Sequence, residues 1–232
     1  MKKADVMIKN AYIITMDHDR NIISNGCIVI DKDKITAVGG GELASCYEAS
    51  RVVDAKGKFV FPGMISTHSH LFQTMLKGLG RDKLLFDWLD SSVRTALHRF
   101  DGEMCYYAAL TGCMEAIQSG TTTLLDYMYC HTSPGLSDYV TQAMEDIGIR
   151  GIYGRGFTNT ANFPPEFKVA HHDTEQDMFD DVRRLYKKYE GHSRMSVALA
   201  PGIIWDNTDD GYREMRKMAD EMHIPLTMHV LE

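Results

Sequence analysis

The sequence has no cluster of basic residues and no long apolar run. Its 25 Lys and Arg residues are outnumbered by 32 Asp and Glu residues, which gives a net charge of −7. Nucleic acids and anionic membranes both require concentrated positive charge, so we expect neither as a partner. No stretch reaches the length of a transmembrane helix, and the N-terminal residues lack the uninterrupted apolar core of a signal peptide. These absences predict a cytoplasmic protein.

The cysteines form no recognisable framework either. There are five of them, an odd number, and no two make a CxxC pair. This arrangement argues against a set of disulfide bonds and against a zinc site built from thiolates. We therefore expect reduced cysteines, with Cys105 and Cys113 buried in an apolar helical pattern.

The first 60 residues are typical of a small β unit. Segments 5–16 and 26–40 are rich in Ile and Val, and segment 51–61 continues the pattern. Turn signals separate them, such as Asp31-Lys32-Asp33, the three glycines at 39–41 and Lys56-Gly57.

After Pro62, short apolar runs alternate with helical patterns. Runs that are apolar throughout are typical of parallel strands covered on both faces. Their alternation with helices predicts βα units joined by right-handed crossovers. The expected strands are 60–68, 121–128, 150–156, 195–201 and 224–230. The expected helices begin at the capping residues Asp101, Ser137, Thr174 (with Asp177 three residues on) and Thr208, and the first two end at Gly120 and Gly148.

Five such strands do not complete a barrel. A half-closed parallel barrel would expose a long apolar edge. The sequence stops at Glu232, just after the last predicted strand, with no covering helix. Two interpretations stay open, a small open sheet or an incomplete piece of a larger fold, and we favour the second.

Histidines close the first and the last of these runs. His68 and His70 lie two residues apart, so on a strand their side chains point the same way and can bind one metal ion. The alternative is a hydrogen-bonded core histidine beside an exposed one. His229 ends the last run, and Glu232, three residues later, can fold back over the end of the strand. For Glu232 the alternative is a surface carboxylate.

Both pairs fall at the carboxyl ends of predicted parallel strands, where barrel active sites form. Three imidazoles suit zinc or iron. A carboxylate that is not a ligand supplies the proton shuttle that metal-activated water needs.

Three segments resemble a known family. They are 61–89 (FPGMISTHSHLFQTMLKGLGRDKLLFDWL), 108–127 (AALTGCMEAIQSGTTTLLDY) and 225–232 (PLTMHVLE). They resemble the metal-dependent amidohydrolase superfamily, in the branch of cytosine/guanine-type deaminases and triazine chlorohydrolases. The resemblance runs from about residue 5 to the last residue.

This resemblance implies an α/β fold, a (β/α)8 TIM-type barrel of which residues 61–232 hold about five strands, with a β-sandwich portion over 1–60. It implies one divalent metal, zinc or iron, with His68, His70 and His229 as ligands. Glu232 would take a proton from the activated water and deliver it to a ring nitrogen or leaving group.

Four residues are candidates for contact with the substrate. Gln73 matches a position that often binds the substrate's ring in this branch. Trp88 and Arg155 are further candidates for the pocket lining, with packing and a surface ion pair as the alternatives. His131 follows the second predicted strand, where loops form the mouth of a barrel.

The sequence also departs from the family. The family carries another histidine after its sixth strand and an aspartate at the end of its eighth, and this chain ends before both. Trp205 stands where nucleoside deaminases of the family tend to carry a histidine, which argues against adenosine-like substrates.

Three functional hypotheses follow. The first is a hydrolase that deaminates a purine-, pterin- or triazine-like ring and releases ammonia. The second uses the same site to release chloride or an alkylamine. The third is a catalytically incomplete fragment that lacks a C-terminal half. For an active enzyme we expect a heterocyclic small-molecule substrate and a homo-oligomer.

Overall fold

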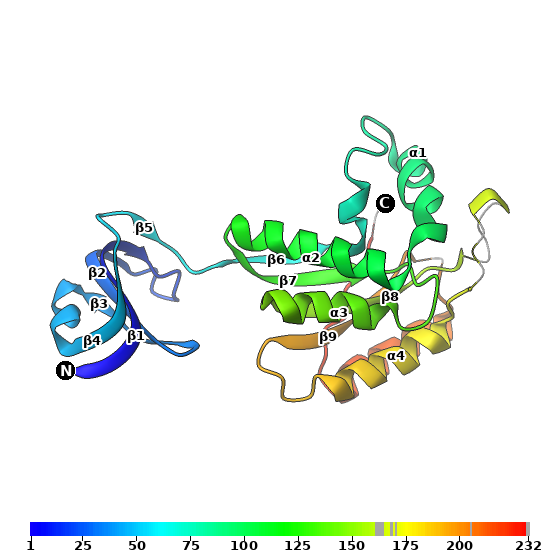
Figure 1. Cartoon of the computed structure of the whole chain (residues 1–232). Coiled ribbons are helices and arrows are strands. Elements are labelled where there is room, and N and C mark those ends of the chain that lie inside the picture. Colours follow the sequence, from blue (N-terminus) through cyan, green and yellow to red (C-terminus); the bar gives the residue numbers. More distant parts are fainter. Residues whose placement is uncertain (161–164, 168, 170, 205, 231–232) are drawn as a thin grey trace. The chain divides into compact units, whose positions relative to one another are not determined.

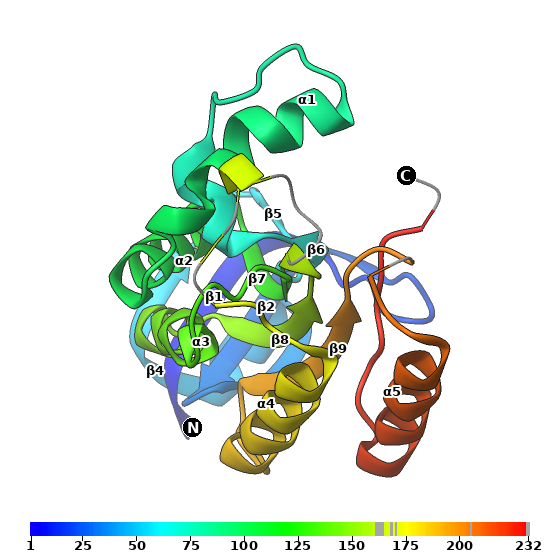
Figure 2. The ribbon, with the colours of Figure 1, turned by 90° about the vertical axis from the view of Figure 1, so that its right-hand side faces the viewer.

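The computed structural model describes residues 1–160, 165–167, 169, 171–204 and 206–230. The chain divides into two compact units, Met1–Gly63 and Met64–Glu232, and Figures 1 and 2 label their strands and α-helices. Within the described residues, every helix is too short or too polar to cross a membrane.

The N-terminal unit is a five-stranded β-sheet. Its main path runs β3 (Lys34–Gly40), β2 (Ile22–Asp31), β1 (Lys2–Ile14) and β4 (Tyr47–Asp54), and β5 (Phe59–Val60) also pairs with β1. The β1–β2 and β2–β3 pairs are antiparallel, whereas β4 and β5 run parallel to β1. A 3-10 helix, Gly41–Cys46, joins β3 to β4. The predicted β unit is confirmed, with Lys32 at the β2–β3 turn in the left-handed region (φ 53°).

The second unit is built on a parallel four-stranded sheet. Its strands are β6 (Met64–Ser69), β7 (Thr121–Met128), β8 (Arg150–Phe157) and β9 (Met195–Pro201), adjacent in chain order. Right-handed crossovers between strands in this order place all the connecting helices on one face. Those helices are α2 (Gly102–Gln118), α3 (Leu136–Ile147), α4 (Glu175–Lys188) and α5 (Asp209–Met222), and Figure 2 shows them around the same side of the strands. The predicted βα alternation is confirmed.

Short helical turns connect β6 to α2. They are a 3-10 helix (Leu71–Leu76), α1 (Leu85–Leu89), a π-helical turn (Asp90–Arg94) and a second 3-10 helix (Leu97–Arg99). A further 3-10 helix, Pro165–Phe167, lies between β8 and α4. The segment after β6 carries several side chains of the candidate site.

Three helices begin at the predicted capping residues. The side chains of Asp101, Thr174 and Thr208 accept hydrogen bonds from the backbone of the first turn, and Thr174 forms a complete capping box with Asp177. The start of α3 was predicted wrongly. Gly135, with φ of 81°, turns the chain two residues before Ser137, so Ser137 lies inside the helix. Its hydroxyl accepts from Arg184 of α4 instead.

The predicted fifth strand at 224–230 is wrong. This segment forms a single parallel bridge, Leu226 to Leu199 of β9. Leu199 donates to the Pro225 carbonyl, and Thr227 donates to the Leu199 carbonyl. The next donors along the ladder would be Pro201 on one side and Pro225 on the other, and proline has no N–H. The two prolines therefore stop the ladder in both directions.

The main core of this unit lies between the sheet and its helices. It includes Leu124, Tyr153 and Val197 from the strands and Val140, Val182 and Met215 from the helices. A smaller cluster of Leu125, Tyr127 and Ala200 covers the opposite face of the sheet. All five cysteines are free, and Cys105 and Cys113 are fully buried, as predicted.

Candidate metal centre

Three histidine side chains meet at the carboxyl end of the parallel sheet. The Nε2 atoms of His68 and His70 are 3.1 Å apart, and those of His68 and His229 are 3.3 Å apart. One ring nitrogen of each lies within 4.8 Å of the others. Two nitrogens at about 2.0–2.1 Å from one tetrahedral ion are roughly 3.3 Å apart. The spacing of the three rings therefore fits a single metal ion.

Bonds to the neighbouring strand hold the backbone on both sides of His70. Ser69, between the two histidines, points the other way, and its hydroxyl donates to the Leu125 carbonyl (2.8 Å). Directly after His70, the Leu71 N–H donates to Oδ1 of Asp126 (2.7 Å). The alternation of the strand and these two bonds bring His68 and His70 to one side.

The hydrogen bond of His70 leaves the correct nitrogen free for a metal. Its Nδ1 lies 2.5 Å from the carbonyl oxygen of Tyr127. A carbonyl only accepts, so Nδ1 carries the hydrogen and Nε2 keeps its lone pair. Burial lowers the pKa of His70 to about 4, opposed by the Tyr127 bond and reinforced by His68 and His229. His70 is therefore neutral at pH 7, which is the form that binds metals.

His229 rests against an anchored tyrosine. Its ring stacks on Tyr127 with centroids 4.5 Å apart and an angle of 22° between the planes. Tyr127 is fully buried, and its hydroxyl donates to the carbonyl oxygens of Pro201 and Gly202. Tyr127 thus ties β7 to the end of β9 and fixes the surface on which His229 lies.

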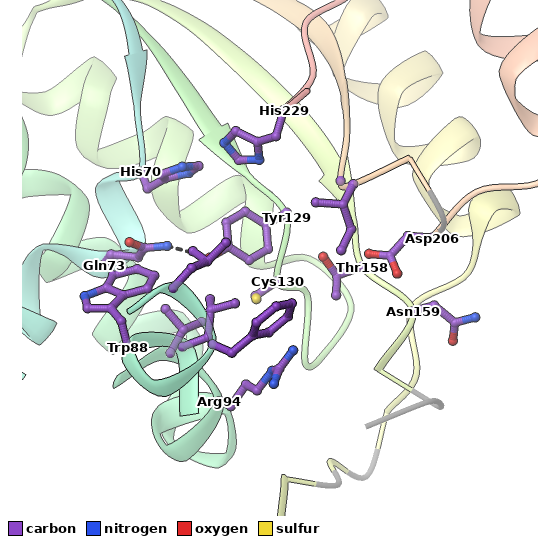
Figure 3. Close-up of a pocket in the computed structure, with 16 residues that line it drawn as sticks. His70, Gln73, Trp88, Arg94, Tyr129, Cys130, Thr158, Asn159, Asp206 and His229 are labelled. Atoms are coloured by element: carbon purple, nitrogen blue, oxygen red, sulfur yellow. Dashed lines mark hydrogen bonds between the residues drawn. The ribbon is translucent and has the colours of Figure 1, made fainter. Parts of the chain in front are cut away.

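A cavity of about 300 Å³ opens beside His70 and His229. Figure 3 shows its side chains converging from the loops that follow the strands. The volume falls at the lower end of the range for small-molecule sites. The lining includes Gln73, Trp88, Val93 and Arg94 from the segment after β6, Tyr129 and Cys130 after β7, Thr158 and Asn159 after β8, and Gly202, Ile203 and Asp206 after β9.

Two of the four predicted substrate contacts lie in this cavity. Gln73 and Trp88 both line it, and Nε2 of Gln73 donates to the hydroxyl of Tyr129 (2.6 Å). Tyr129 itself was missed by the sequence analysis, although its place just after β7 is a signal for the mouth of the site. Glu232 and Trp205 lie outside the described residues.

His131 and Arg155 lie elsewhere. Arg155 is buried, and its guanidinium donates to both oxygens of Asp173 (2.7 and 2.9 Å) and to Asp181 of α4 (2.9 Å). His131 accepts from Arg155 at Nδ1 (2.8 Å) and lies 3.1 Å from the hydroxyl of Tyr153. Neither residue lines the cavity. Arg155 was predicted to line the pocket, with packing and a surface ion pair as the alternatives. Its ion pairs are buried, and we assign both side chains to the packing of β8 against α4.

A second group of possible metal donors has other partners. His171, Asp173 and Asp177 also lie within reach of a common ion. However, Asp173 is paired with Arg155, and Asp177 completes the capping box of α4. We therefore assign this group to structural roles.

Asp126 is completely buried beneath the turn that carries His70. Its Oδ1 accepts from Leu71, whereas its Oδ2 has no hydrogen-bond partner among the described atoms. Burial raises the pKa of this carboxyl from 3.8 to about 7. The backbone bonds from Leu71 and Tyr127 oppose that shift.

This shift predicts a pH dependence that Asp126→Asn should remove. As the pH rises from 3.8 to about 7, the unfolded carboxyl ionises before the folded one. The contribution of Asp126 to the free energy of unfolding should therefore fall by about 1.4 kcal/mol per pH unit across that window and stay level on either side, and it appears as the difference between the parent and the variant. Asparagine keeps an acceptor for Leu71 and does not ionise. Urea unfolding at several pH values checks this, and equal slopes for the parent and the variant would count against it.

The chain is similar to known proteins over most of its length. The sequence pattern described as the Amidohydrolase family matches residues 59–232. A 5-methylthioadenosine/S-adenosylhomocysteine deaminase of Nitratidesulfovibrio vulgaris (strain DP4) is 30% identical over 229 residues, which are 98% of this chain and 49% of that protein. The chain thus spans about half the length of the curated relatives it matches.

Solved structures show the same fold. An adenosine deaminase from Xanthomonas campestris with bound zinc superposes with a TM-score of 0.86 at 19% identity, covering 99% of this chain and 50% of that one. A triazine hydrolase from Arthrobacter aurescens gives a TM-score of 0.83 at 21% identity, with 98% and 53% covered. The family match takes in all three clustered histidines and every residue of the cavity lining, and the chain belongs to the amidohydrolase family.

Proposed function

We propose that this chain is part of a metal-dependent hydrolase that deaminates a heteroaromatic ring. The proposal rests on one observation, the cluster of three histidines beside a cavity. Nε2 of His68 lies 3.1 Å from Nε2 of His70 and 3.3 Å from Nε2 of His229. Such a donor set, in which one histidine is neutral and has an ordered outer partner, is typical of a catalytic metal site.

His68, His70 and His229 would hold the ion, and we propose zinc, with iron as the alternative. Three nitrogen ligands suit either metal, and the Xanthomonas campestris structure contains zinc. When bound, the metal supplies a Lewis acid that lowers the pKa of water toward neutrality. The Tyr127 carbonyl keeps His70 in the metal-binding tautomer, and the Tyr127 ring supports His229.

We further propose that the parallel sheet is part of a (β/α)8 barrel. Its four strands follow one another in chain order, with helices on one side, which is the barrel arrangement rather than that of a doubly wound sheet. The position of the site, at the carboxyl ends of the strands, supports the same fold.

The cavity suits a flat ring. Trp88 and Tyr129 offer aromatic surface, on which planar heterocycles stack. Gln73 donates to Tyr129 through Nε2, so its Oε1 remains to accept a hydrogen bond from a ring N–H or amino group. For Glu232 we keep the role of proton shuttle, which its place three residues after His229 and the family resemblance support.

Among heteroaromatic rings we favour adenine. The deaminase of Nitratidesulfovibrio vulgaris matches 98% of this chain and acts, by its name, on adenosine derivatives. Trp205 counts against such substrates at a single position. The similarity to the Nitratidesulfovibrio vulgaris deaminase extends over 229 residues, so we give it more weight. The similarity to a triazine hydrolase keeps displacement of chloride or an alkylamine as the second candidate.

Product analysis tests this proposal. The zinc-loaded chain is incubated separately with adenosine, guanine and a chlorotriazine, and ammonia and chloride are measured. We expect ammonia from adenosine. Chloride release from the triazine alone would favour the second candidate. A chain that binds zinc but releases neither product would favour the incomplete fragment.

A further inference from the structure

We propose that Asp206 selects the substrate by accepting a hydrogen bond from a hydroxyl or amino group on the substituent attached to the reacting ring. This inference rests on the proposed function, and it concerns the part of the substrate that the metal centre does not touch. Asp206 was not among the candidates from the sequence, although it lies in the loop after β9, at the mouth of the site.

Asp206 lines the cavity on the side away from the residues expected to hold the ring. Figure 3 shows Asp206 and Thr158 together on the side of the cavity across from Gln73 and Trp88. A ring stacked beside Trp88 and held by Gln73 would direct its substituent toward Asp206. The Asp206 N–H donates to the Ile203 carbonyl (3.0 Å), so a backbone turn fixes the residue in place.

One oxygen of the Asp206 carboxyl lacks a hydrogen-bond donor among the described atoms. This oxygen, Oδ2, is buried. Burial raises the pKa of Asp206 to about 6, and bonds from the Asn159 backbone and the Thr158 side chain oppose this shift. The carboxyl is therefore mostly ionised at pH 7. A buried carboxylate oxygen without a donor is costly. A turn of the Asp206 carboxyl that brings this oxygen to the cavity surface would let a substrate group donate to it and remove that cost.

The charge of Asp206 decides which substituents fit. A carboxylate only accepts hydrogen bonds, so it binds hydroxyl and amino groups and repels phosphate and carboxylate groups. Arg94, the other charged residue of the lining, pairs with Asp90 (2.6 Å), and its charge also acts to lower the pKa of Asp206. Asp206 should therefore favour a nucleoside over the same ring with an alkyl substituent.

A comparison of two ligands tests this inference. Adenosine carries hydroxyl donors on its substituent, whereas 9-methyladenine has the same ring without them. For the parent and Asp206→Asn, kcat/KM for ammonia release and the Kd from equilibrium dialysis are measured with both ligands. We expect the adenosine to 9-methyladenine ratio of each quantity to shift against adenosine by about 10- to 100-fold in the variant, the value of a hydrogen bond to a charged group. A residue that merely supports the loop would weaken both ligands alike and leave the ratios unchanged.

The matched control is Asp210→Asn, the same substitution at an exposed carboxylate in the first turn of α5. Its ratios should equal those of the parent. An unchanged ratio for Asp206→Asn overturns the inference, even if the parent releases ammonia and the proposed function stands. Failure of the parent to bind either ligand overturns both. Binding in the expected ratio without ammonia release supports the role of Asp206 and counts against the proposed chemistry.

Discussion

His229→Ala is expected to remove the bound metal from this chain. The side chain supplies one of three clustered imidazoles, and its Nε2 lies 3.3 Å from that of His68. Removal of a group that only hydrogen-bonds to a metal ligand weakens metal affinity by about 10- to 100-fold. Removal of the ligand itself should therefore weaken the affinity by more than about 100-fold. After dialysis, elemental mass spectrometry should find about one zinc or iron per parent chain and almost none in the variant.

A histidine outside the cluster provides the control for this experiment. His18 is exposed in the N-terminal unit, so His18→Ala should keep the metal content of the parent. Full metal content in His229→Ala would mean that the three rings do not hold the ion. Absence of metal from the parent itself would favour structural roles for the histidines or a site completed by residues beyond this chain.

Arg155→Ala should lower the free energy of unfolding by about 3–5 kcal/mol, because it breaks a buried ion pair and leaves its partner uncompensated. Arg155 pairs with Asp173 at 2.7 Å, and the side chains are 4% and 3% exposed. Asp173 would then keep a buried charge without its guanidinium. Denaturation with urea, followed by circular dichroism, measures the loss.

An exposed pair of the same type provides the contrast. Arg216 and Asp220 lie four residues apart on α5, with side chains 63% and 65% exposed. Exposed pairs of this kind contribute about 0–1 kcal/mol, so Arg216→Ala should change the unfolding midpoint little. Equal losses in the two variants would mean that burial does not govern the contribution of the Arg155 network.

The local part of the site was predictable from the sequence. Residues two apart on a strand share a face, so the convergence of His68 and His70 follows from the run that precedes them. The approach of His229, 161 positions from His68, depends on tertiary structure. No local sequence pattern predicts this approach. Two things indicated it: the rule that parallel strands end at a common edge, and the family resemblance.

The errors have equally specific causes. Arg155 stands between Gly154 and Gly156, so no apolar neighbours indicate which face of β8 it occupies, and the packing of α4 decides. The interruption near 224–230 was visible in the sequence, because Pro201 and Pro225 each remove a donor from a parallel ladder.

The bridge at Leu199 has a consequence for the dynamics of the metal centre. Among the described residues, two backbone hydrogen bonds join segment 224–230 to β9. Because these backbone bonds are few, hydrogen exchange in this segment should be faster than in β7 or β8. Only the docked fraction presents all three imidazoles at once, so the apparent metal affinity is scaled by that population. A bound metal ion would link His229 to His68 and His70, and it should therefore slow the hydrogen exchange of the amides around Leu226.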